Sequence, residues 1–222
     1  SLSILLLISV ATSFVVYRKW WRGFFKPIRW RDARTAWGDF HRLAGVWSLW
    51  FVALIALTGL WYLVEQLGGD APDLPEPAQA IAAMPAGSRP ADAAARLAAS
   101  LAAVRRADPG LEIEAVQFPD DKSGAFIFQG QRNAWLVRPR ANAVWVDAAT
   151  ARVVMASDGG DLGVHQRISE MADPLHFGTF AGYWTRIPWF LFGLLMTGLA
   201  LSGAAIYSHR IAHSARAAVA RH

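Results

Sequence analysis

Two uncharged stretches, each 22 residues long, restrict this chain to folds that place helices across a membrane. They run from Leu43 to Val64 and from Ile187 to Ser208. A helix rises about 1.5 Å per residue, so this length suffices for a hydrocarbon core of about 30 Å. Ser1 to Tyr17 is also uncharged and is followed by Arg18 and Lys19. Because a cleaved signal peptide carries its positive charges before the apolar run, we interpret this segment as a third transmembrane helix.

Basic residues are concentrated in the short segments that flank these helices. Loop 18–42 contains eight Lys or Arg and two acids, and tail 209–222 contains three arginines and no acid. Residues 65–186 contain eleven basic and fifteen acidic residues. The positive-inside rule therefore places loop 18–42 and the tail in the cytoplasm, and the long segment 65–186 on the outer side. The net charge of +5 is explained by the membrane flanks, and we expect no nucleic-acid partner.

The segment between the second and third predicted helices contains a linker and a small α+β domain. Residues 65–90 are rich in Gly, Pro and Ala and lack a helical or strand period, which is typical of a linker. A helical period then begins at Pro90 and stops at Pro109. Alternating side chains predict three to five strands, within 111–115, 125–129, 134–138, 143–146 and 152–155, with turns at 120–124 and 147–151. We assign residues 91–157 to the outer domain and 158–186 to a pre-membrane segment.

Several kinds of redox and catalytic site are absent from the sequence. It contains no cysteine, which excludes disulfides, iron–sulfur clusters, thiolate zinc sites and the attachment of c-type haem. It also contains no G-x-G-x-x-G, P-loop, H-E-x-x-H or G-x-S-x-G motif. No nicotinamide, flavin or nucleotide site is indicated.

Two histidines lie just before predicted transmembrane helices, where an ionisable residue is costly and is a functional candidate. His41 lies at the cytoplasmic end of the second helix, and His176 precedes the third helix on the outer side. Neutral imidazole is the usual axial ligand of b-type haem. Gly45, one turn after His41, and Gly178 and Gly182, near His176, would let a flat macrocycle approach the backbone. The alternative is that both histidines only anchor helix ends at the membrane interface, as Trp and Tyr do.

The remaining histidines are weaker candidates. We interpret His165 as a surface residue of the pre-membrane segment, His209 as a lesser alternative ligand, and His213 and His222 as parts of a solvated tail. Small residues within the helices are interpreted as positions of close helix packing. They are Gly193, Thr197, Gly198, Ser202 and Gly203 in the third helix, and Thr58 and Gly59 in the second.

Three stretches of the chain have a familiar pattern: FHRLAGVWSLWFVALIALTGLWY (40–62), ADPLHFGTFAGYWTRIPWFLFGLLMTGLALSGAAIYSHR (172–210) and VDAATARVV (146–154). They resemble the PepSY-associated transmembrane family, which includes bacterial siderophore-iron reductases. The most specific parts are His41-Arg42, Thr58-Gly59 and Leu175-His176-Phe177-Gly178. The third stretch resembles the closing hairpin of a PepSY domain, with Ala151 at the position where that pattern has glycine.

The resemblance implies a membrane all-α helical bundle with an inserted small α+β PepSY-like outer domain. Family members have four spans in two similar halves, each with an outer domain between its spans. On that plan Ser1 to Tyr17 corresponds to the second span, so three transmembrane helices are present here and the first span and first outer domain are missing. Histidines of the missing half would pair with His41 and His176 across the bundle.

The resemblance also implies a function in iron uptake. We expect two haem b groups, with His41 and His176 as iron ligands and Gly45 and Gly178 beside them. Electrons would pass from a cytoplasmic or membrane donor to an acceptor on the outer side, with a ferric siderophore as the favoured acceptor. The expected location is the bacterial inner membrane, in contact with lipid, with the middle domain in the periplasm. The alternative is a non-enzymatic, membrane-anchored PepSY module that binds a peptide, a protease or an assembly partner.

Overall fold

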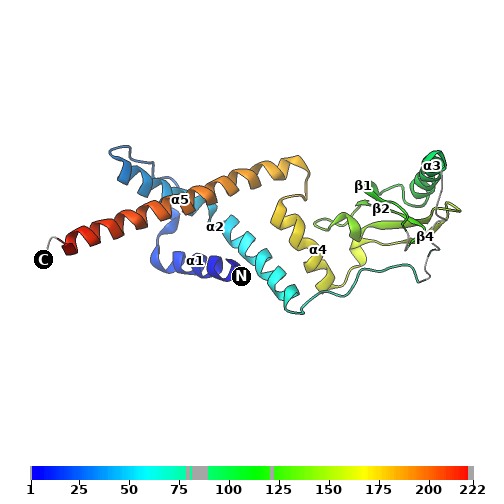
Figure 1. The fold of residues 1–222 in the computed structure, drawn as a ribbon, viewed down its shortest axis with the longest axis horizontal. Helices are drawn as coiled ribbons and strands as arrows, with labels where there is room; N and C mark the ends of the chain where they lie inside the picture. Colours follow the sequence, from blue (N-terminus) through cyan, green and yellow to red (C-terminus); the bar gives the residue numbers. More distant parts are fainter. Residues whose placement is uncertain (1, 79–80, 82–89, 121–122, 220–222) are drawn as a thin grey trace. The chain divides into compact units, whose positions relative to one another are not determined.

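The computed structural model describes residues 2–78, 81, 90–120 and 123–219. It divides into two compact units, one formed by Ser1–Leu63 with His176–His222 and the other by Val64–Leu175. The first unit contains the apolar helices and the second contains the sheet (Figure 1). The described ranges do not include residues 79–80 and 82–89 of the predicted linker, nor residues 121–122 of a predicted turn.

The helical unit is built from α1 (Leu2–Val16), a short 3-10 helix η1 (Trp20–Gly23), α2 (Ala33–Gln66) and α5 (Tyr183–Val219). Within the described ranges, two helices are long and apolar enough to cross a membrane, α2 and the Tyr183–Ser208 part of α5. These contain the two uncharged stretches. The helix α1 is apolar but has 15 residues, about 22 Å of rise, so its crossing of the membrane stays a prediction.

The long helix α2 begins ten residues before its uncharged stretch. Asp32 caps it, since its Oδ1 accepts a hydrogen bond from the Thr35 N–H at 2.9 Å and its carbonyl accepts one from the Ala36 N–H at 3.0 Å. The Asp32 carboxylate also accepts a hydrogen bond from the Thr35 hydroxyl at 2.8 Å. Its two bonds with Thr35 lower the pKa of Asp32. The end of the predicted basic loop is therefore helical, and His41 lies within the helix rather than before it.

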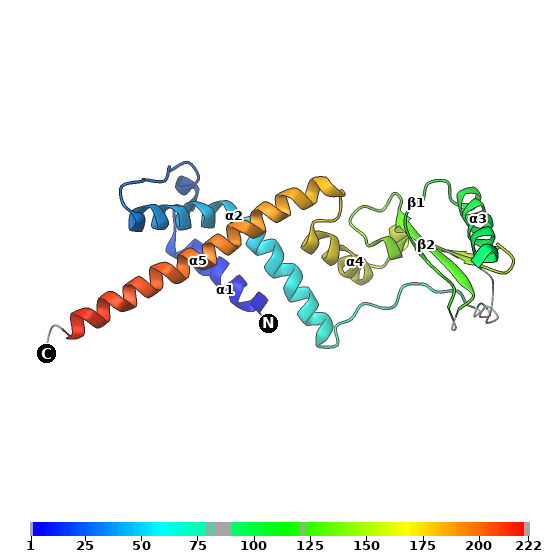
Figure 2. The same cartoon turned by 45° about the horizontal axis from the view of Figure 1, so that its top comes forward.

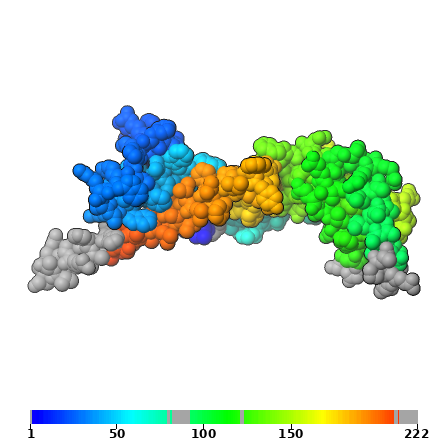
Figure 3. All heavy atoms as spheres, turned by 90° about the horizontal axis from the view of Figure 1, so that it is seen from above, coloured from blue at the N-terminus to red at the C-terminus, as the bar shows by residue number. Residues whose placement is uncertain are grey.

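The helix α5 crosses α2 in both ribbon views (Figures 1 and 2). An added Cβ at Gly198 would lie 3.0 Å from the Phe40 ring, and one at Gly59 would lie 2.5 Å from Ser3 Oγ. Two of the predicted close-packing glycines thus do lie at close contacts, whereas Gly193 has no atom within 4 Å of its Cβ position. In the space-filling view, the beginning of α2 and the body of α5 lie against each other (Figure 3).

A cluster of aromatic rings joins α2 and α5. Trp50 and Phe51 of α2 contact Trp189 and Phe192 of α5, with ring centroids 4.8 to 6.1 Å apart. Such pairs contribute about 0.5–1.5 kcal/mol each beyond the area that they bury. These four residues therefore fix the contact between the middle of α2 and the first turns of α5.

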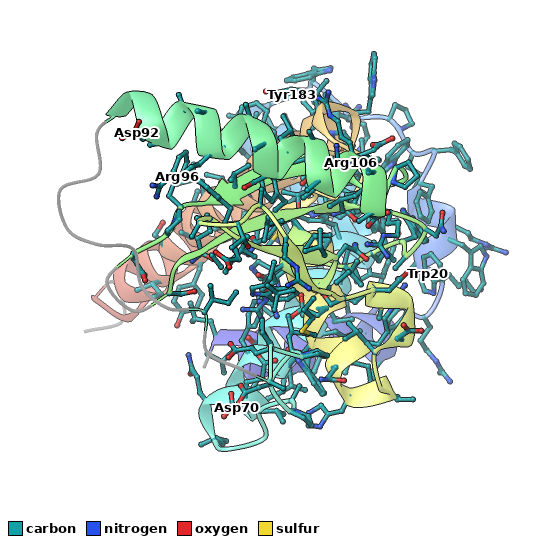
Figure 4. All side chains as sticks on the ribbon, turned by 90° about the vertical axis from the view of Figure 1, so that its right-hand side faces the viewer. Trp20, Asp70, Asp92, Arg96, Arg106 and Tyr183 are labelled. Carbon is teal, nitrogen blue, oxygen red and sulfur yellow. The ribbon has the colours of Figure 1, made fainter. Side chains whose placement is uncertain are left out.

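The second unit is an antiparallel sheet with one helix on one face, as the sequence predicts. Its strands are β1 (Glu112–Gln117), β2 (Ala125–Gln131), β3 (Ala143–Asp147) and β4 (Val153–Ala156), in that spatial order. The helix α3 (Pro90–Ala107) lies across this sheet, with Asp92 near its start and Arg106 in its last turn (Figure 4). Charges of these signs favour a helix through its dipole.

The core of this unit lies between α3 and the sheet. Alternate residues of β2 and β3 point into it, so Phe126, Phe128, Val144 and Val146 are fully or almost fully buried. Leu97, Leu101 and Val104 of α3 pack on them, which confirms the predicted apolar face of the helix.

One predicted strand of this unit is wrong. Residues 134–138 form no strand, because Leu136 has a φ of +57°, outside the extended region that a strand requires. Ala134 and Val137 instead pack with Ala141 and Leu162 in a small second core. The predicted turn at 147–151 is confirmed, and Ala151 adopts a left-handed φ of +52° there.

The helix α4 (Val164–Phe177) occupies the segment that sequence patterns left without a secondary-structure assignment. Its Glu170 side chain is 2% exposed and accepts hydrogen bonds at 2.8 Å from both Arg138 and Arg140. A buried carboxylate needs such partners, so this cluster fixes α4 on the connection between β2 and β3. His176 follows in the last turn of the same helix.

Candidate functional site

His41, near the start of α2, is held by a serine of another helix. Its Nδ1 lies 2.8 Å from the Oγ of Ser202, which is fully buried in α5. An added Cβ at Gly203 would lie 3.4 Å from His41 Cε1, so a small residue at this position lets the imidazole approach α5. The described residues offer the His41 Nε2 no hydrogen-bond partner.

His176 makes the equivalent contact at the other end of α2. Its Nδ1 lies 2.8 Å from Oγ1 of Thr58, a buried residue of α2. Two aromatic rings pack against the imidazole edge to face, Tyr62 with centroids 5.3 Å apart and Phe177 with centroids 5.0 Å apart. Both candidate histidines are thus bound through the same ring nitrogen to a hydroxyl of a neighbouring helix.

Each of the two hydroxyl groups also lies within hydrogen-bond distance of a carbonyl of its own helix. Ser202 Oγ is 3.1 Å from the carbonyl of Leu199, and Thr58 Oγ1 is 2.9 Å from the carbonyl of Leu54. A carbonyl only accepts, and a hydroxyl has one proton, so a hydroxyl that donates to its carbonyl accepts from the histidine. In that tautomer the proton is on Nδ1, and the lone pair of Nε2 is the one that can bind a metal.

The spacing of the two sites along α2 matches the thickness of a membrane. His41 and Thr58 are 17 residues apart on this helix, which corresponds to a rise of about 25 Å. The hydrocarbon core of a bilayer is about 30 Å thick. One histidine therefore lies near each end of the apolar segment.

A cavity of about 380 Å³ adjoins His41. It is lined by His41, Arg42, Gly45, Val46 and Leu49 of α2, and by residues of α1 and η1 that include Ser9, Thr12, Ser13 and Trp20. Cavities of this size are within the range that binds small ligands. Gly45 therefore lies beside His41 at an open space, as the sequence predicts. A Cβ added at Gly45 would lie 3.7 Å from the Leu199 side chain.

Protein atoms fill the space over Gly178, two residues after His176. Gly178 has a φ of +66°, and an added Cβ would lie 2.5 Å from the Trp189 ring. The space over Gly178 is thus taken by an indole, and its role beside a macrocycle stays a prediction. Gly182 also has a positive φ, +60°, and has no atom within 4 Å of its Cβ position.

The other histidines lie apart from these two sites or outside the described side chains. His165 is exposed, as the sequence predicts, and its Nε2 lies 3.1 Å from the carbonyl oxygen of Gly69. The side chains of His209 and His213, and all of His222, are outside the described residues. Across the described ranges, no three His, Asp or Glu side chains gather as a metal site would require. An axial haem ligand needs no such cluster, because the macrocycle supplies the other iron ligands.

Sequence patterns missed the roles of Ser202 and Thr58. Both were interpreted as small residues for helix packing, and both instead bind the candidate histidines through their hydroxyls. The only signal in the sequence was that each is a polar residue within an uncharged helix.

Comparison with known protein families gives a match over most of the chain. The sequence profile of the family described as the PepSY-associated TM region matches residues 2–210. No curated protein matches the chain.

Proposed function

The chain belongs to the PepSY-associated transmembrane family and is a membrane protein, and from this premise we propose that it is a haem b electron-transfer protein. The single observation that carries the proposal is the shared contact of His41 and His176. The Nδ1 atom of each lies 2.8 Å from a buried hydroxyl of a neighbouring helix, so that with the proton on Nδ1 the lone pair is on Nε2. Metal-binding histidines commonly donate their other ring N–H in this way.

The residues at the two sites fit axial ligation. A hydrogen bond from Nδ1–H fixes the orientation of the ring and raises the basicity of Nε2. A histidine that only anchored a helix end at the interface would direct its polar atoms to water rather than to a buried hydroxyl. A bound haem would supply a one-electron couple, and the two histidines would hold one such group near each face of the membrane.

The favoured acceptor is a ferric siderophore on the outer side, with iron as the substrate. One electron from a cytoplasmic or membrane donor reduces Fe(III) to Fe(II), and the donor is oxidised by one electron. Hard oxygen ligands hold Fe(II) less well than Fe(III), so reduction favours release of the iron. The proposed location is the bacterial inner membrane, with the sheet domain in the periplasm.

Charge asymmetry predicts the orientation that this direction of transfer requires. A topology reporter fused after Arg34 should be active only in its cytoplasmic form, and one fused near residue 122 only in its outer form. If the second fusion reports a cytoplasmic position, the direction of transfer is inverted.

The proposal is tested by a visible spectrum of the full-length protein purified from membranes of haem-producing cells. We expect a reducible b-type spectrum that is lost when both histidines are replaced, in His41→Ala/His176→Ala. The matched control is His165→Ala, because this exposed histidine lies in the other unit and should leave the spectrum unchanged. Absence of haem from the well-folded wild-type protein would exclude the electron-transfer function.

A second candidate function is an anchored binding module, and one observation favours it. A cavity of about 650 Å³ lies in the sheet unit, lined by linker residues 70–76 and by Gln117, Gln129, Arg138 and Trp145. This size suits a short peptide segment or a small molecule. The module would be supported if the protein captured such a ligand while binding no haem.

A further inference from the structure

The cavity beside His41 contains a cationic side chain whose hydrogen bonds are incomplete. Arg42 lines this cavity, and its Nε is buried without a hydrogen-bond partner among the described residues. Its Nη1 donates to Asp39 at 3.0 Å, and its Nη2 donates to the carbonyl of Lys26 at 3.2 Å. A buried N–H of a charged group without an acceptor is unfavourable, so Nε is a position where an added acceptor would stabilise the protein.

The charges around Arg42 also favour an anion. Asp39 accepts from the Arg29 backbone N–H at 3.0 Å and from the Arg29 Nε at 2.9 Å, in addition to its bond with Arg42. Two guanidinium groups therefore share one carboxylate, which leaves an excess of one positive charge. Arg42 is the only formally charged side chain among the described residues that line the cavity.

Two hydroxyls of the cavity bond within their own helix. Thr12 Oγ1 donates to the carbonyl of Ile8 at 2.8 Å, and Ser13 Oγ donates to the carbonyl of Ser9 at 2.7 Å. The His41 Nδ1 lies 2.8 Å from Ser202 Oγ. A charged donor bonds a carboxylate more strongly than a neutral one, so Arg42 would be the strongest partner of a carboxylate that entered this space.

We propose that Arg42 binds a propionate carboxylate of the haem whose iron is bound by His41. The inference rests on the proposed function and extends it by a residue that positions the prosthetic group. Arg42 follows His41 directly in α2, and both line one cavity, so a single macrocycle with iron at its centre and carboxylates at its edge could contact both. This one bond would give the Arg42 Nε an acceptor and would also neutralise the excess positive charge.

The test is a thermodynamic cycle whose first step leaves the residues of the His41 site unchanged. Haem-free full-length protein in detergent is titrated with haem b and with haem dimethyl ester, in which both carboxylates are neutral. We expect the wild-type protein to bind haem b about tenfold more tightly than the ester at the His41 site, as for loss of one charge-assisted hydrogen bond. The His176→Ala background isolates that site.

The variants then identify the partner of the carboxylate. Arg42→Met should lower the affinity for haem b about tenfold and leave that for the ester unchanged. Arg29→Met is the matched control, since it removes the other guanidinium bound to Asp39 but not a residue that lines the cavity. In that variant the preference for haem b over the ester should remain.

Each outcome separates the two proposals. If the wild-type protein binds neither compound, the haem function itself fails. If haem b and the ester bind equally to wild type, or if Arg42→Met weakens both equally, haem binding stands and the assignment of Arg42 is overturned. Equal binding would also be the result if Arg42 contacted a lipid phosphate instead.

Discussion

The two histidine sites share one hydrogen-bond geometry and differ in what surrounds the ring. In both, Nδ1 lies 2.8 Å from a buried hydroxyl of a neighbouring helix. His41 adjoins an open cavity of about 380 Å³ that also contains Arg42, whereas His176 is packed against Tyr62 and Phe177. The hydroxyl contact therefore orients the ring, and the neighbouring side chains set how much room a ligand has.

This difference predicts that the site at His41 accepts a macrocycle with little rearrangement. At His176 the described side chains would have to move, with the Tyr62 and Phe177 rings the first to be displaced. The following predictions test whether haem binding depends more on the hydrogen-bond geometry that the two sites share or on the surroundings in which they differ.

The largest effect is expected from removal of either histidine. His41→Ala and His176→Ala should each remove about half of the reducible b-type absorbance, since in the proposed function each histidine binds one haem. Electron transfer across the membrane should be lost completely in both, because a two-station path needs both stations. Difference spectra and reduction of an outer acceptor by vesicles measure the two quantities. Full absorbance and activity in both variants would eliminate the electron-transfer interpretation.

Removal of the hydroxyls should have a smaller effect, of similar size at both ends. Ser202→Ala and Thr58→Val keep the histidines but remove the acceptor of the Nδ1 proton. Loss of such a partner typically weakens metal binding about 10–100-fold. Haem titration of each variant measures this loss. Thr197→Val is the control, because its hydroxyl bonds within α5 to the Gly193 carbonyl and contacts no histidine. An unchanged affinity in Ser202→Ala would mean that its hydroxyl only packs helices.

Glycine substitutions should separate the two surroundings. Gly178→Ala places a Cβ at a left-handed φ and 2.5 Å from the Trp189 ring, so we expect it to destabilise the protein by about 1–2 kcal/mol or more. Gly45→Ala meets only Leu199, at an ordinary contact distance of 3.7 Å, and should be nearly neutral. Thermal unfolding of the purified protein in detergent measures both. Equal losses of stability would contradict the difference between an open and a filled site.

Filling the cavity beside His41 should change the stability of the protein least. Its effect on haem binding should be confined to the His41 site. Gly45→Leu adds a side chain to the space beside His41, so it should reduce haem binding there and leave binding at His176 unchanged. The comparison is made in His176→Ala and His41→Ala backgrounds, each of which isolates one site. A loss at both sites would show that the substitution disturbs α2 as a whole.

The sequence predicted those features that depend on local patterns. The uncharged stretches, the apolar face of α3 at Leu97, Leu101 and Val104, and the turn before β4 all follow from composition or periodicity. Ala151 is informative, because the family pattern has glycine there and the residue adopts a left-handed φ of +52°. Glycine adopts that conformation without strain, which gives a physical reason for the pattern.

Features that depend on distant contacts were not predictable. The partners of His41 and His176 lie 161 and 118 residues away in the sequence, and nothing in a serine or a threonine indicates which helix it will face. The helix α4 was missed because it lacks a long apolar period and contains Pro174. The strand expected at 134–138 was wrong because burial of Ala134 and Val137 arises from packing on Leu162, not from a sheet.

The helix α2 supplies the histidine at one end and the hydroxyl at the other, and this arrangement has a consequence for how the protein can vary. A shift of α2 by one residue turns its side chains by about 100° and would break both bonds at once. Substitutions at His41, Thr58, His176 and Ser202 should therefore show epistasis across the membrane, although the pairs are about 25 Å apart. Among related proteins, the residues at these four positions are expected to change together rather than one pair at a time.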